Sequence, residues 1–211
     1  MSTDSLSPIA KRFRRYLPVV IDIETAGLNA STDAVLEVAA VLLKIDADGW
    51  LHPDASHFCH VTPFENANID PEALEFNGID PDHPFRFAVS ENEALQTILL
   101  PIRKAVRTSG CLRAVLVGHN PAFDLGFLTA MIDRCQYKHS PFHPFTTLDT
   151  ATLSALALGH TVLAVACERA GISFETNKAH SALYDAQKTA ELFCFICNEW
   201  KRLGGQTEFN Q

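Results

Sequence analysis

The sequence predicts an α/β fold with a central mixed β-sheet flanked by α-helices. Apolar runs typical of strands come first, at residues 19–24 and 34–46, with only a short polar connection between them. Later strand-like runs alternate with helix-like segments, which is typical of parallel strands joined by helices. An antiparallel pair followed by parallel strands makes a mixed sheet.

The elements after this pair are expected from turn residues and apolar periodicity. Residues 56–64 are expected as a third strand, and residues 66–85, rich in Pro, Asn and Asp, as a short helix within loops. The elements beyond residue 112 alternate in type: strand 113–120, helix 121–135, strand and helix 145–158, helix 161–171 and helix 180–203.

A longer helix is expected between these two groups. Ser90 is its candidate N-cap, and Glu93 three residues later completes a capping box. Gly110 is expected to end the helix. Pro101 is expected to kink it, because proline removes one hydrogen bond of the helix.

At 211 residues the chain is long enough for one domain with a substantial core. We expect a basic N-terminal segment at 1–16, a folded domain at 17–205 and a tail at 206–211. No apolar run approaches the roughly 18 residues of a membrane span, and the first residues lack the apolar part of a secretory signal. A cytoplasmic protein without a membrane segment is therefore expected.

Six cysteines occur in the chain, and only Cys194 and Cys197 form a C-x-x-C pair. A zinc knuckle needs a second pair of ligands with matching spacing, which the sequence lacks. Buried, reduced thiols are the expected state, and they suit a reducing compartment.

The stretch VVIDIETAGL places two acids, Asp22 and Glu24, inside an apolar strand. Residues two apart on a strand point to the same face, so these carboxylates are expected side by side. Their repulsion and burial require compensation, which a divalent metal with hard oxygen ligands would supply. The alternative is a strand end that reaches solvent, with Glu24 starting a turn.

Three further polar residues stand at element boundaries. Asp124 follows the strand at 113–120, where ligands of α/β sheets gather, although an N-cap is the alternative. Asp185 lies near the inward stripe of the last helix, or serves only as a first-turn acid. His180 is five residues earlier and would not share a helix face with Asp185, so it is expected on the preceding loop, over a site or merely solvated.

Together these residues supply four carboxylates and one imidazole, which suit two Mg²⁺ or Mn²⁺ ions about 3.5–4 Å apart. The stretches VVIDIETAGL, VGHNPAFDLGFL and AHSALYDA resemble the three motifs of the DEDD exonuclease superfamily. The spacing of His180, Ala182 and Asp185 is similar to that of the DEDDh branch. The stretches PEALEFNGID, HPFTTLDTATLSALALG and WKRLGG resemble the ribonuclease T family specifically.

This resemblance implies a ribonuclease H-like fold and a 3′–5′ exoribonuclease that releases nucleoside 5′-monophosphates. It implies tRNA and other stable RNAs, including rRNA precursors, as substrates, with activity on single-stranded DNA 3′ ends as well. It assigns the two metals to Asp22, Glu24, Asp124 and Asp185. It assigns the role of general base to His180, whose ordinary pKa of about 6.5 suits that role.

The resemblance also implies a set of residues that hold the 3′-terminal bases. Phe76, Phe123 and Phe145 would stack on bases, with Glu72 beside them, whereas the alternative for each phenylalanine is a place in the core. Leu28 stands where the family usually has a further phenylalanine. Leucine stacks less well, so end-base preference is expected to differ while the chemistry survives.

The net charge of −8 argues mildly against general binding of nucleic acid, but two stretches are locally basic. They are either a solvated tail and helix face or a phosphate-binding surface. The resemblance favours the second, in a homodimer whose basic patch on one subunit feeds RNA to the other's site, with Lys138 nearer the site. The candidates are Arg12, Arg14, Arg15, Arg107, Arg113 and Lys138.

Two alternative functions remain open at this point. A DNA-proofreading-type exonuclease or an oligoribonuclease would use the same motifs. A catalytically inactive RNA-binding module would have the same fold, although the presence of all five site residues argues against it.

Overall fold

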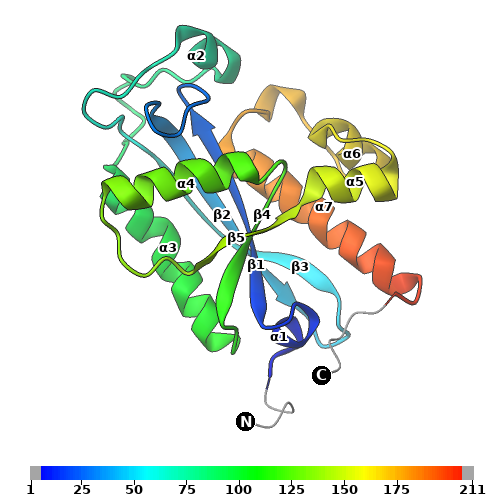
Figure 1. The fold of residues 1–211 in the computed structure, drawn as a ribbon. Helices are drawn as coiled ribbons and strands as arrows, with labels where there is room; N and C mark the ends of the chain where they lie inside the picture. The colour runs from blue at the N-terminus through cyan, green and yellow to red at the C-terminus, as the bar shows by residue number, and fades with distance from the viewer. Residues whose placement is uncertain (1–5, 206–211) are drawn as a thin grey trace.

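The computed structural model describes residues 6–205, so the predicted tail at 206–211 and the first five residues lie outside it. Its centre is a five-stranded sheet in the order β3-β2-β1-β4-β5 (Figure 1). The strands are β1 Tyr16–Thr25, β2 Val35–Ile45, β3 Leu51–His60, β4 Arg113–Gly118 and β5 Phe142–Asp149. The helices are α1 Pro8–Arg12, α2 Pro71–Asn77, α3 Glu91–Thr108, α4 Ala122–Arg134, α5 Thr150–Leu158, α6 Leu163–Arg169, α7 Ala182–Arg202 and the 3₁₀ helix Thr176–Lys178.

The strand directions confirm the predicted mixed sheet. β1 pairs antiparallel with β2, and β2 pairs antiparallel with β3. β1 and β4 are parallel, as are β4 and β5. β1 is therefore the central strand, and its residues Val19, Val20 and Ile21 are fully buried.

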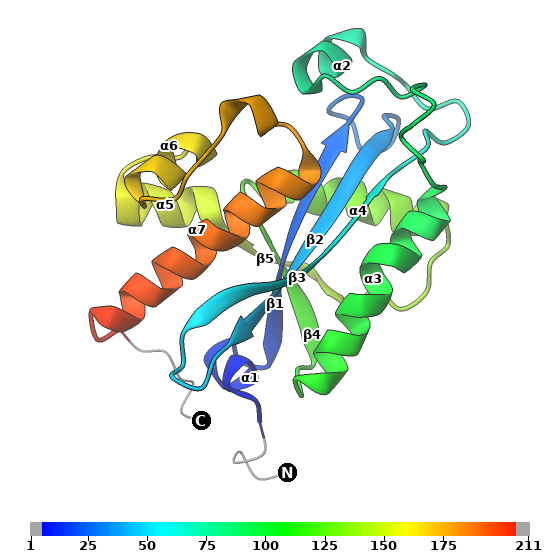
Figure 2. The ribbon, with the colours of Figure 1, turned by 180° about the vertical axis from the view of Figure 1, so that it is seen from behind.

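Helices cover both faces of this sheet. In two opposite views, α3 and α4 lie on one side of the strands, and α7 with α5 and α6 lies on the other (Figures 1 and 2). α7 packs along β1, β2 and β3. This arrangement follows from right-handed crossovers, because β3–α3–β4 and β4–α4–β5 step across the sheet in the same direction.

The basic N-terminal segment contributes to the folded core. Its residues 8–12 form α1, which the sequence analysis did not anticipate, and Ile9 and Ala10 are buried there. β1 already begins at Tyr16. The sequence carries little signal for this short helix, because it lies among charged residues and has only two buried positions.

The bounds of β3 differ from the prediction, whereas the start of α3 agrees with it. β3 begins at Leu51 rather than at residue 56, because an edge strand pairs on one side only and tolerates exposed polar residues. α3 has the predicted capping box between Ser90 and Glu93, and the helix continues through Pro101.

Within residues 6–205, no single helix is long and apolar enough to cross a membrane. Only the bent pair α5 and α6 reaches the required length and composition, and only when the two helices are taken together.

Candidate active site

Strand β1 carries the first two acids beyond Val20, the last residue of β1 that pairs with β4. Asp22 lies opposite Ala39 of β2, and Glu24 lies opposite Glu37. The two carboxylates share one face of the strand, because side chains alternate along it. The pairing becomes irregular between Glu24 and Thr25, where β1 ends.

Asp124 comes from the first turn of α4, just after β4. The N-cap of this helix is Pro121, so Asp124 does not serve as the cap. Instead its Oδ1 accepts a hydrogen bond of 3.0 Å from the backbone N–H of Ile23. This bond holds the Asp124 carboxylate against β1, between the positions of Asp22 and Glu24.

The last helix supplies Asp185 and the loop before it supplies His180. His180 lies outside α7, as its spacing predicted, with an unusual positive φ of 64°. Its backbone N–H donates to Asp185 Oδ2 over 2.9 Å. Ligand atoms of Glu24, His180 and Asp185 all lie within 4.8 Å of one another, so β1 and the start of α7, far apart in the sequence, converge here.

Burial raises the pKa of all four acids, and repulsion from neighbouring carboxylates adds to the increase at Asp22 and Glu24. The pKa of Asp22 lies well above its usual range, first through burial and then through the charge of Asp124. Burial, followed by the charge of Asp185, raises the pKa of Glu24 to about 8. Burial raises the pKa of Asp124 to about 7 and also raises that of Asp185.

The cluster lacks the cationic partners that buried acids normally have. Among the described residues, none of these four acids forms an ion pair with lysine or arginine. Asp185 Oδ1 is buried and has no hydrogen-bond donor. Clustered carboxylates with an oxygen left unpaired fit the hard oxygen ligand set of a divalent cation.

A fifth acid of this neighbourhood, Glu37, was missed by the sequence analysis. It is 7% exposed, and its charge contributes to the raised pKa of Asp22 and Glu24. The only sequence signal was one acid inside the apolar run 34–46. That signal gains meaning only from the strand register, which sets Glu37 opposite Glu24.

The candidate base-binding residues differ in their exposure. Leu28, Phe76 and Phe145 are 86%, 70% and 78% exposed, so neither of these two phenylalanines takes the core position that was its alternative. The Phe76 ring centroid lies 4.3 Å from that of His180, which puts α2 beside the acidic cluster. Glu72 lies on the same helix and is exposed.

Phe123 is the member of this set that packs partly into the core. Its ring centroid lies 4.9 Å from that of the buried Phe127. It is half-buried rather than exposed. Phe123 immediately precedes Asp124 in the first turn of α4.

Several candidate phosphate-binding residues have protein partners. Arg12 donates to the carbonyl oxygen of Cys197, and Arg15 donates to that of Gly110. Lys138 was expected nearer the site, but it follows the C-terminal end of α4, whereas Asp124 lies in the first turn. The side chains that the structure leaves exposed are Arg14, Arg107, Arg113 and Lys138.

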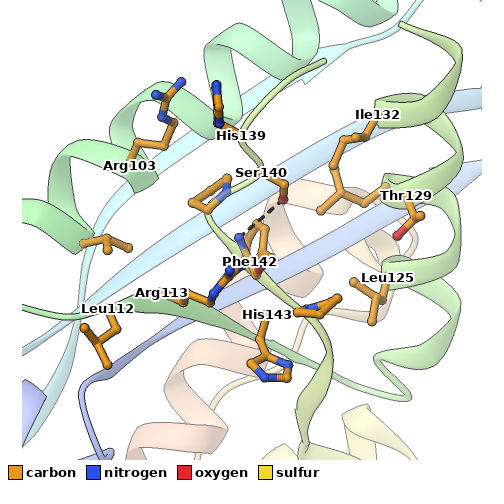
Figure 3. A pocket seen from close by; sticks show the side chains of 14 residues that line it. Arg103, Leu112, Arg113, Leu125, Thr129, Ile132, His139, Ser140, Phe142 and His143 are labelled. Atoms are coloured by element: carbon orange, nitrogen blue, oxygen red, sulfur yellow. Dashed lines mark hydrogen bonds between the residues drawn. The ribbon is translucent and has the colours of Figure 1, made fainter. Parts of the chain in front are cut away.

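Arg113 lies at the start of β4 and lines a cavity of about 640 Å³ (Figure 3). Arg103, His139 and His143 lie around the same cavity, whose remaining wall is mainly apolar. None of the four clustered acids is among its lining residues. The basic cavity and the acidic cluster are therefore at different ends of β4.

Comparison with solved structures first identifies the fold. The chain is similar to Escherichia coli Exonuclease I in complex with a dT13 oligonucleotide, with a TM-score of 0.64, 17% identity and coverage of 90% of this chain and 42% of the other. It is also similar to a full-length 3′-exonuclease, with a TM-score of 0.66, 16% identity and coverage of 92% and 65%. The chain thus spans less than half of the Exonuclease I chain. These likenesses confirm a ribonuclease H-like fold.

The sequence comparisons then give the family. The family model RNase_T, described as Exonuclease, matches residues 19–193. Ribonuclease T of Salmonella choleraesuis (strain SC-B67) is 58% identical over 95% of this chain and 93% of its own length. Ribonuclease T of Enterobacter sp. (strain 638) is 58% identical over 95% and 89%. The chain belongs to the RNase_T family of exonucleases and is a nuclease, as the motif resemblance predicted.

Proposed function

We propose that the chain is a 3′–5′ exoribonuclease that hydrolyses the terminal phosphodiester of single-stranded RNA and releases nucleoside 5′-monophosphates. One observation carries the proposal: four carboxylates from β1, α4 and α7 converge without a cationic partner in the described part of the chain. The similarity to proteins named Ribonuclease T supports RNA as the substrate class.

The four acids Asp22, Glu24, Asp124 and Asp185 would hold two Mg²⁺ or Mn²⁺ ions. The ions would supply an activated water and would stabilise negative charge on the leaving oxygen. The raised pKa of these acids and the unpaired Asp185 Oδ1 support this ligand set, because bound cations would favour the charged form of each acid.

His180 would act as the general base that takes the proton from the attacking water. Its ring is exposed and lies near Glu24 and Asp185, so it can reach an atom held between these acids. The hydrogen bond from its backbone N–H to Asp185 joins the loop to the first turn of α7. A positioned base of this kind contributes roughly 10²–10⁴-fold to the rate.

The exposed aromatic side chains Phe76, beside His180, and Phe145, on β5, would bind the last bases of the substrate. Phe76 and Phe145 present open ring faces, and Phe123 would contribute its exposed side. Stacking of this kind is worth about 1–3 kcal/mol per base. Leu28 would pad a base without stacking, and Glu72 would face a base edge from α2.

We propose further that the enzyme is a cytoplasmic homodimer that trims tRNA and rRNA precursors and also accepts single-stranded DNA 3′ ends. The exposed cations at Arg14, Arg107, Arg113 and Lys138 would contact phosphates, and Arg12 and Arg15 would support them. A neighbour of this fold was solved with a DNA oligonucleotide, which is consistent with overlap between RNA and DNA substrates.

The test uses the pure protein, Mg²⁺ and two 5′-labelled single strands of the same sequence, one RNA and one DNA. We expect a ladder that shortens from the 3′ end, faster on RNA, and abolished by EDTA. Faster decay of DNA would shift the assignment to a DNA exonuclease of the proofreading type. Binding without cleavage of either strand would refute the enzyme proposal.

A further inference from the structure

Glu37 is a buried acid of β2 that the proposed chemistry does not use. The strand register places it between Glu24 of β1 and His60 of β3. Directly opposed residues share a face of the sheet, so the three side chains form a row across three strands. The row leads from the acidic cluster toward the edge of the sheet.

The Glu37 carboxylate contacts two separate groups with its two oxygens. Oε2 accepts a hydrogen bond of 3.1 Å from the backbone N–H of Ala182, the first residue of α7. Oε1 lies 3.0 Å from His60 Nδ1, at ion-pair distance but without the alignment of a hydrogen bond. Arg86 donates to the carbonyl oxygen of Leu36 and adds a positive charge nearby.

The contact with Ala182 places the Glu37 carboxylate at the start of α7. The first backbone N–H groups of a helix have no acceptor within the helix and normally bond to a capping side chain. Ser181, at the N-cap position of α7, makes no such bond with its side chain. Glu37 therefore supplies the acceptor from another strand, and its negative charge suits the positive end of a 21-residue helix.

The capped turn carries two residues of the proposed site. Ala182 follows His180 by two positions and precedes Asp185 by three, so a shift of Ala182 moves both. We propose that Glu37 is a positioning residue that anchors the first turn of α7 to β2 and so sets Asp185 and His180 against Glu24. This inference rests on the proposed exonuclease function. In this role Glu37 acts through the position of α7 rather than by contact with the reacting atoms.

Two conservative substitutions separate anchoring from a purely electrostatic role. Glu37→Gln keeps an oxygen at the same reach from the Ala182 N–H but loses the charge. Glu37→Asp keeps the charge but withdraws the oxygens by one methylene. An anchoring role predicts that Glu37→Asp loses activity and Glu37→Gln keeps most of it, whereas a role of charge alone predicts the opposite order.

The matched control is Glu91, another buried glutamate in an ion pair. It is 8% exposed and lies 2.7 Å from Arg134, which donates to both of its carboxylate oxygens. Glu91→Asp shortens this acid in the same way as Glu37→Asp does. We expect both variants to lose thermal stability and only Glu37→Asp to lose kcat.

The experiment measures kcat and KM on the single-stranded RNA, together with hydrogen exchange of the amides at residues 182–186, for the four full-length proteins. We expect kcat of Glu37→Asp to fall about 10- to 100-fold, with KM changed less than about threefold, because small displacements of reacting groups are costly. Exchange at residues 182–186 should accelerate in Glu37→Asp, and both readouts should stay near wild type in Glu37→Gln and Glu91→Asp.

Unchanged exchange in Glu37→Asp, or a larger loss of kcat in Glu37→Gln than in Glu37→Asp, would overturn the anchoring role. Wild-type protein that fails to cleave RNA would instead refute the proposed function, and the exchange measurement would still test the anchor. If Glu37→Asp does not fold, Glu37→Gln decides the question, because a kcat loss of tenfold or more there contradicts anchoring by the side-chain oxygen.

Discussion

Asp33 and Asp124 are both 5% exposed, yet their surroundings are opposite. Asp33 lies in the loop after β1 and accepts hydrogen bonds from Asn29, Thr32 and Asn68 at 2.9, 2.7 and 3.0 Å. Burial alone would raise the pKa of Asp33, but these donors lower it on balance. Burial raises the pKa of Asp124 to about 7 despite the bond from Ile23.

The difference separates a buried acid that accepts several hydrogen bonds from its own loop from one that is proposed to bind a metal. Asp33 has its charge satisfied by groups of its own loop and a neighbouring segment. Asp124 lies near Asp22 and accepts one hydrogen bond, from Ile23, so a cation in the proposed site would compensate its charge. The same substitution at the two positions should therefore have opposite consequences.

The largest expected effect is that of Asp124→Asn on catalysis. The variant keeps an oxygen for the Ile23 N–H but removes a charge from the proposed metal site. We expect kcat on single-stranded RNA to fall by about 10³-fold or more, which corresponds to roughly 4 kcal/mol of lost stabilisation. The measurement is the rate of 3′ shortening of a labelled strand in Mg²⁺.

The same variant should keep or gain thermal stability in EDTA, because one repelling charge is gone from the cluster. A variant that is both inactive and less stable in EDTA would mean that Asp124 is a structural acid like Asp33. That result would remove the contrast between the two positions.

The second prediction concerns the pH dependence of stability without divalent cations. Folded Glu24 keeps its proton up to about pH 8, whereas the unfolded chain loses it near the ordinary value of 4.5. The folded state then binds more protons between these values, so the free energy of unfolding falls as pH rises. We expect a lower Tm at pH 8 than at pH 5, by about 2–4 °C for each kcal/mol lost.

Mg²⁺ or Mn²⁺ should raise the Tm more at pH 8 than at pH 5, because the cations bind the ionised cluster. The check is thermal unfolding at the two pH values with EDTA or with either ion. Two results would contradict the raised pKa of the buried acids. One is a Tm in EDTA that does not fall between pH 5 and 8, and the other is a stabilisation by metal that is equal at both pH values.

The smallest expected effect is that of Asp33→Asn. The amide places an NH₂ group against donors that now face a carboxylate, so the variant should lose about 1–3 kcal/mol of stability. We expect kcat to stay within about threefold of wild type. Thermal unfolding and the RNA assay measure the two quantities on the same preparation.

The pH profile gives Asp33 a second signature. Its pKa is lowered on folding, so its contribution to stability is present above the ordinary value of 3.8 and is lost as pH falls below it. The Tm difference between wild type and Asp33→Asn should therefore shrink in acid. A Tm difference that stays constant down to pH 3 would show that the charge of Asp33 does not stabilise the loop.

The sequence by itself determined the features that depend on short-range geometry. The period of two put Asp22 and Glu24 on one face of a strand, and the five-residue spacing put His180 on the loop before α7. The order of strand-like and helix-like runs was enough for the mixed α/β sheet. The motif pattern was enough for the exonuclease family, because its members share these local spacings.

Only the tertiary structure decided which distant groups meet. Asp33 and Asp124 are each one acid near an element boundary, and the donors that distinguish them come from other segments. Glu37 was an isolated acid until the register of three strands set it between Glu24 and His60 and against the start of α7. Contacts of this kind depend on strand order and crossover path, which local propensity does not encode.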